Sequence, residues 1–146
     1  MRRVALTLFA FAALLAAPGS ASACSCAPDP TAASILASST AVFTAAVADT
    51  KEIRKYVSVT TFRIIESFKG PAAGATVKVL HPSGPTASCG VKFVAGQTYT
   101  LAAHRTEPKN DGATLTTTQC STWMFLPHVG LSERLIEDLR ALRAQR

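Results

Sequence analysis

Four cysteines are the residues of this chain whose type and spacing carry the most chemical information. Cys24 and Cys26 are separated by one residue, whereas Cys89 and Cys120 lie far along the chain. Cysteine pairs that catalyse disulfide exchange usually have the spacing C-x-x-C near a helix N-terminus, so the C-x-C spacing does not favour that activity. In a short exported chain, an even number of cysteines predicts a disulfide framework.

The N-terminus has the three parts of a secretory signal peptide. Arg2 and Arg3 precede an apolar run from Val4 to Ala17, and Ala21-Ser22-Ala23 is a small-x-small cleavage site. The apolar run of 14 residues is shorter than the roughly 20 that a membrane-spanning helix needs. We therefore predict that residues 1–23 are removed and that Cys24 begins a mature protein in the periplasm or outside the cell, with no membrane span.

The mature chain, residues 24–146, is short enough for a single domain. Without Arg2 and Arg3 it has 13 basic and 9 acidic residues, a net charge of +4. Both of its basic clusters are expected to be solvated surface, because basic residues are not interleaved with aromatic residues as in nucleic-acid binders. One cluster is Lys51, Arg54 and Lys55, and the other is Arg134, Arg140, Arg143 and Arg146. We expect a monomer that binds no nucleic acid and needs no cofactor.

Five segments rich in Val, Thr, Phe and Tyr, separated by Gly and Pro turns, are predicted to be strands. They are Ala41–Ala48, Tyr56–Phe68, Thr76–His81, Thr98–His104 and Thr114–Thr118. The second segment changes phase: Val57 and Val59 share one parity, whereas Phe62 and Ile64 share the other, which predicts a bulge or a strong bend.

A helix is predicted at each end of this β region. Asp29 is the expected N-cap and Pro30 the first helical residue of a short helix that continues over Thr31–Ser38. Apolar residues recur at helical spacing in 131–146, with Ser132 as the expected cap. Five strands of moderate length with a helix at each end predict a mainly β protein, a five-stranded OB-like Greek-key barrel.

The predicted mature N-terminus, Cys24-Ser25-Cys26-Ala27-Pro28, resembles the start of the tissue inhibitors of metalloproteinases, which belong to the netrin-like group. Further similarities follow in the same order along the chain, from Cys24 to about Phe125. They are Phe68-Lys69-Gly70-Pro71, Cys89-Gly90-Val91 with Tyr99-Thr100-Leu101-Ala102, and Cys120. The resemblance implies a netrin-like OB fold for the inhibitory domain.

The resemblance also implies the disulfides Cys24–Cys89 and Cys26–Cys120 and a mechanism of inhibition. The free α-amine and the carbonyl of Cys24 would chelate the catalytic zinc of a partner protease, since a neutral amine can bind a metal. The zinc then belongs to the protease and is shared only in the complex. Ser25 would point into the specificity pocket. The residues implied to contact the protease are Cys24, Ser25, Cys26, Ala27, Pro28, Ala87 and Ser88.

The chain departs from the family in two respects, and alternatives follow. It lacks the third disulfide of the animal inhibitory domain, and a plain helix over 131–146 replaces the cysteine-rich C-terminal subdomain. The cysteines could serve only as staples of a non-inhibitory netrin-like module of the cell envelope, or Cys24 could be lipidated. The residues alone leave three possible pairings of the four cysteines, and the pairing that joins Cys24 to Cys26 would be strained.

An enzyme is not predicted. His81, His104 and His128 lie in different segments, and no serine has the sequence context of a nucleophile elbow. Trp123, Met124 and Phe125 are expected to pack against the barrel.

Overall fold

A computed structural model describes residues 26, 30–85, 89–122 and 132–145 of the chain. The secondary structure, in chain order, is α2 (Ala32–Ser38), β1 (Ala41–Arg54), β2 (Val57–Lys69), β3 (Thr76–Pro82), β4 (Thr98–Asn110), β5 (Ala113–Thr116), α3 (Gln119–Thr122) and α4 (Glu133–Ala144).

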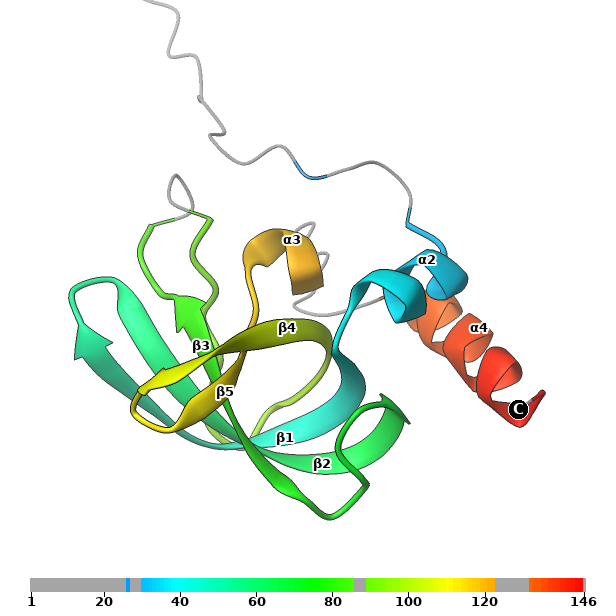
Figure 1. The fold of residues 1–146 in the computed structure, drawn as a ribbon, viewed down its shortest axis with the longest axis horizontal. Helices are drawn as coiled ribbons and strands as arrows, with labels where there is room; N and C mark the ends of the chain where they lie inside the picture. The colour runs from blue at the N-terminus through cyan, green and yellow to red at the C-terminus, as the bar shows by residue number, and fades with distance from the viewer. Residues whose placement is uncertain (1–25, 27–29, 86–88, 123–131, 146) are drawn as a thin grey trace, which may run out of the picture.

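The five strands form one closed sheet in the order β1-β2-β3-β5-β4, with β4 pairing back onto β1 (Figure 1). All neighbours are antiparallel except β3 and β5, which pair in parallel. The class predicted from the sequence is therefore confirmed: the protein is mainly β, with a five-stranded closed sheet, a short helix before it and a helix after it.

Alternating apolar residues fill the interior of the sheet. Phe43, Phe62, Val79 and Leu101 are completely or almost completely buried there, and aromatic rings meet edge to face, as between Phe62 and Phe93 at 5.0 Å. Burying side chains of this size stabilises the fold by about 1.5–3 kcal/mol each. The interior therefore makes a rigid base for the loops at its ends.

The predicted phase change in the second strand has a bulge opposite it, but this bulge lies in β1 and not in the second strand itself. The register of β1 on β2 shifts between Val47 and Asp49, opposite Phe62 and Thr61. One extra residue in β1, Ala48, is accommodated there, as in a β-bulge. Phe62 and Ile64 belong to the interior cluster, whereas Val59 is buried outside it.

Strands β1 and β4 continue well beyond their predicted ends, to Arg54 and Asn110. The extra residues of β1 belong to a hairpin with β2 and are mostly exposed. Because the side chains of β1 in this part are mostly exposed, its sequence carries no alternation of apolar and polar residues. The backbone pairing, which the sequence pattern does not reveal, extends the strand.

A second apolar cluster lies outside the barrel, where α2 and α4 pack together (Figure 1). Ile35 and Leu36 of α2 and Leu139 of α4 are buried against Val42 and Phe68. Helix α4 begins at the predicted cap, since the hydroxyl of Ser132 accepts the N–H of Leu135 at 3.4 Å. Helix α4 thus belongs to the folded domain and holds α2 on the sheet.

The predicted start of the first helix is wrong. Its N-cap is Thr31, two residues after Asp29, and Pro30 precedes the helix. Thr31 accepts the N–H of Ser34 at 3.1 Å, while the Ser34 hydroxyl accepts the N–H of Thr31 at 3.0 Å. Serine here takes the place of the glutamate in the usual capping box, so this reciprocal pair prevails over the Asp-Pro signal.

Candidate functional site

The candidate site is the end of the barrel where the cysteines gather. Cys26 forms a disulfide with Cys120, with 5.2 Å between their Cα atoms and a sequence separation of 94. Cys120 lies in α3, a four-residue helix that directly follows the barrel. The predicted pairing of these two cysteines is confirmed, and it ties the N-terminal segment to the barrel.

Cys89 lies beside this disulfide. The backbone N–H of Gln119 donates to the carbonyl oxygen of Cys89 at 3.4 Å, so Cys89 and Cys120 belong to adjacent strips of chain. None of the cysteines that the structure describes is a free thiol. The other predicted pairing, Cys24–Cys89, involves Cys24, which lies outside the described residues, and it stays a prediction.

The backbone around Cys89 is closely packed against the rest of the barrel. Cys89 itself has a positive φ of 55°. A Cβ on the next residue, Gly90, would lie 2.1 Å from the carbonyl oxygen of Gly84, closer than any real contact. Val91, two residues after Cys89, is buried and donates its N–H to the carbonyl of Pro82 at 2.7 Å. Cys89 is therefore fixed to the barrel on its C-terminal side.

Helix α2, the first element after Cys26, is itself held in place on the barrel. The helix begins at Thr31 and buries Ile35 and Leu36. The ammonium group of Lys69 donates to the carbonyl oxygen of Leu36 at 2.6 Å, near the helix C-terminus, where a cation is favourable. Cys26 is thus held by its disulfide, and Thr31 begins a capped helix that packs on the barrel.

The other predicted contact residues, Ser25, Ala27, Pro28, Ala87 and Ser88, lie outside the described residues. The structure nonetheless brings together the positions that flank them. Cys26 precedes Ala27, and Cys89 follows Ser88, and both are held at the same end of the barrel by the contacts around α3. Trp123, Met124, Phe125 and His128 also lie outside the described residues.

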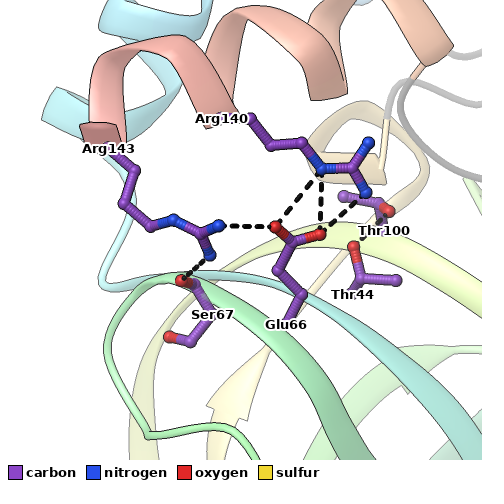
Figure 2. Close-up of polar contacts among 6 residues, drawn as sticks. All are labelled: Thr44, Glu66, Ser67, Thr100, Arg140 and Arg143. Carbon is purple, nitrogen blue, oxygen red and sulfur yellow. Dashed lines mark hydrogen bonds and ion pairs between the residues drawn. The ribbon is translucent and has the colours of Figure 1, made fainter. Parts of the chain in front are cut away.

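An ion-pair cluster on the outer face of the sheet joins α4 to β2 (Figure 2). Glu66 accepts from Arg140 at 2.8 Å and from Arg143 at 2.9 Å. These bonds, above all the hydrogen bond from Arg140, hold the pKa of Glu66 below its ordinary value of 4.5. Sequence reasoning did not find this cluster, because Glu66 and Arg140 are 74 residues apart.

The predicted basic cluster at Lys51, Arg54 and Lys55 lies at the exposed end of the β1–β2 hairpin. The ammonium group of Lys51 is 3.9 Å from a carboxylate oxygen of Asp111, and that of Lys55 lies 5.1 Å above the ring of Tyr56. This agrees with a solvated surface.

Within the described part of the chain, no three His, Cys, Asp or Glu side chains form a group that could hold a metal ion. In the same residues, no helix is both long enough and apolar enough to cross a bilayer. Comparison of the sequence with protein-family models found no matching family, and comparison with curated proteins found no significant match.

Proposed function

We propose that the mature protein is a secreted or periplasmic inhibitor of zinc metalloproteases that acts through the α-amine and carbonyl of Cys24. The observation that carries this proposal is the arrangement of the anchors, with Cys26 bonded to Cys120 and Cys89 in backbone contact with the residue before Cys120. A C-x-C segment at the mature N-terminus, bonded to cysteines at this end of the barrel, would project from a rigid base.

The covalent geometry of the N-terminus supports this arrangement. Two residues that are two positions apart have Cα atoms at most about 7 Å apart. Cys24 and Cys26 can therefore both be bonded only if their partners are close together, and Cys89 and Cys120 meet that condition. Fixing a short segment in advance removes much of the ordering entropy that binding would otherwise cost.

The inhibitory chemistry follows from the identity of the first mature residue. Cleavage after Ala23 would give Cys24 a free α-amine next to its own carbonyl oxygen, and these two atoms form a five-membered chelate on a metal. A catalytic zinc site in a protease has three protein ligands and one water. Displacing that water removes the nucleophile of the protease, while Ser25 would enter the adjoining specificity pocket.

The decisive experiment compares the mature protein with a variant that has one additional Ala before Cys24. Both are assayed against a panel of zinc metalloproteases, and both are melted. We expect the native protein to inhibit at least one protease and the extended protein to lose inhibition at an unchanged melting temperature, because only the chelating atoms move. Equal inhibition by the two would rule out chelation by Cys24.

The N-terminus itself is checked by the intact mass of exported protein. A mass that begins at Cys24, with four cysteines oxidised, is expected. A diacylglyceryl group on Cys24 would instead identify a lipoprotein of the cell envelope. A correct mature mass without inhibition of any protease would favour the non-inhibitory netrin-like module.

A further inference from the structure

His81 is buried directly beneath the segment that carries Cys89. The side chain is only 1% exposed. Its Nε2 lies 2.8 Å from the hydroxyl of Thr60, and its Nδ1 lies 3.3 Å from the carbonyl oxygen of Pro82. The ring of Phe93 packs edge to face on the imidazole at 4.9 Å.

These contacts couple His81 to residues 89–93, which we call the anchor segment. The carbonyl of Pro82 accepts the N–H of Val91 as well as the contact from His81. Val91 and Phe93 are the buried residues of the anchor segment, and Phe93 also contacts Tyr99. A change in the charge of His81 therefore affects the carbonyl group of Pro82 and the ring of Phe93. Both of these hold the anchor segment to the barrel.

A chain of hydroxyl groups connects the buried imidazole with the surface. The Thr60 hydroxyl is completely buried and lies 2.9 Å from that of Thr50, an exposed residue of β1. In neutral His81 with its proton on Nδ1, Nε2 accepts from Thr60, which in turn accepts from Thr50. In protonated His81, Nε2 donates, and both hydroxyls reverse so that Thr50 donates to water. These two hydroxyl groups can thus form hydrogen bonds with His81 in both its neutral and its protonated state.

No counter-ion accompanies the charge that protonation would create. The charged side chains on the described parts of the elements around His81 are Asp49, Lys51, Glu52 and Arg54 of β1, Arg63, Glu66 and Lys69 of β2, Lys78 of β3, Lys92 of the anchor segment, and Arg105 and Glu107 of β4. Among the described residues, His81 forms its hydrogen bonds with uncharged groups only. A buried imidazolium without a paired anion is unfavourable.

We propose that His81 is an acid-sensitive switch, whose protonation raises the population of an open anchor segment and so loosens the base on which Cys89 is held. Its effect on inhibition rests on the proposed function, whereas the opening itself does not. At acidic pH the inhibitor would then release its protease faster.

The direction of the effect follows from the pKa of His81. Burial lowers this pKa below its ordinary value of 6.5, and hydrogen bonds with the backbone of Pro82 and Val91 oppose the shift. An open or unfolded chain therefore binds the proton more tightly than the closed one. The closed state keeps its full stability above about pH 6.5 and loses it as the pH falls, until His81 is protonated in the closed state too.

Hydrogen exchange tests the switch without any protease. The readout is the protection factor of the Val91 amide between pH 7 and pH 5, corrected for intrinsic exchange, with amides of the β1–β4 ladder as internal reference. We expect protection at Val91 to fall by up to about tenfold per pH unit below pH 6.5, and to fall less in the ladder. His81→Gln should remove the pH dependence, whereas His104→Gln should retain it.

Constant protection at Val91, an equal loss in the ladder, or an undiminished pH dependence in His81→Gln would overturn the switch. If His81→Gln does not fold, the ring resonances of His81 in the native protein replace it. The loss of protection at Val91 must then begin below about pH 6.5 and level off at the pH where these resonances titrate. Protease dissociation is measured separately. Absence of inhibition at pH 7 refutes the proposed function and leaves the exchange result standing.

Discussion

Arg140 and Glu66 connect the last helix to the barrel through a forked contact (Figure 2). The Nη2 and Nε atoms of Arg140 lie 2.8 Å and 3.1 Å from the same carboxylate oxygen of Glu66. Arg143 binds the other carboxylate oxygen at 2.9 Å and also donates to the carbonyl of Ser67 at 3.2 Å. The side chain of Glu66 is 18% exposed and those of the two arginines are about half exposed, so water and salt screen the contact in part.

Glu66→Gln should lower the free energy of unfolding by about 0.5–1 kcal/mol, since two partly exposed ion pairs lose their charge while the shape of the side chain is kept. Urea unfolding at low salt measures this difference. Glu107→Gln is the matched control: Glu107 is exposed on β4 and has no ion pair among the described residues, so we expect no change. A difference as large in 1 M salt as at low salt would contradict an electrostatic origin.

The same pair predicts a pH dependence. Because the pKa of Glu66 is lowered in the folded protein, the stability that it contributes is present above about pH 4.5 and is lost as the pH falls towards the folded-state pKa. The difference between the native protein and Glu66→Gln should therefore shrink between pH 5 and pH 3. A difference that stays constant over this range would show that the arginines do not act through the carboxylate.

Removal of the Cys26–Cys120 disulfide tests the base of the candidate site. The disulfide joins residues with a sequence separation of 94, and loss of a native disulfide from a small exported domain typically costs about 2–5 kcal/mol. The double variant Cys26→Ala/Cys120→Ala should unfold at correspondingly lower urea concentration. Under conditions where it stays folded, it should also inhibit at least tenfold more weakly, because its N-terminal segment is no longer anchored. Undiminished inhibition would mean that the anchor plays no part in binding.

A pair of glycine substitutions separates steric conflict from backbone strain. Gly90→Ala places a Cβ against the backbone of Gly84, which should cost about 1–3 kcal/mol and displace the anchor segment. Gly96→Ala meets open space, although its φ of +79° is unfavourable for alanine, and should cost about 1 kcal/mol. Chemical shifts of Val91 should change in Gly90→Ala only. A normal Val91 in that variant would show that the close approach of Gly84 and Gly90 is not needed.

The sequence predicted those parts of the fold in which a local pattern reflects burial. Alternating apolar residues located all five strands, and the helical repeat after Ser132 located α4. The exposed end of the β1–β2 hairpin, up to Arg54, has no such pattern, because cross-strand pairing rather than burial makes it a strand. Helix α3 has only four residues, too few to show a period.

Side-chain partners distant in sequence left no local signal. Nothing around Glu66 indicates that Arg140 will reach it, since the contact exists only when α4 lies on the sheet. In the candidate site, the resemblance supplied the pairing of Cys26 with Cys120, and the structure confirmed it. The contact of Gln119 with Cys89, and the position of His81 under Val91, depend on the closed barrel and could only be read from the structure.

Leu139 provides the last test, which asks whether α4 is a structural helix or a contact surface for the protease. Its side chain is fully buried between α2 and the sheet, so Leu139→Ala should lower the free energy of unfolding by about 2–5 kcal/mol. Leu142 is only partly buried in the same cluster, so Leu142→Ala should lower the free energy of unfolding by less. The two variants together calibrate the effect of burial. Because the chelating atoms belong to Cys24, both variants should inhibit normally at temperatures well below their melting points. A folded Leu139→Ala protein with weakened inhibition would instead show that α4, through α2, sets the position of the N-terminal segment.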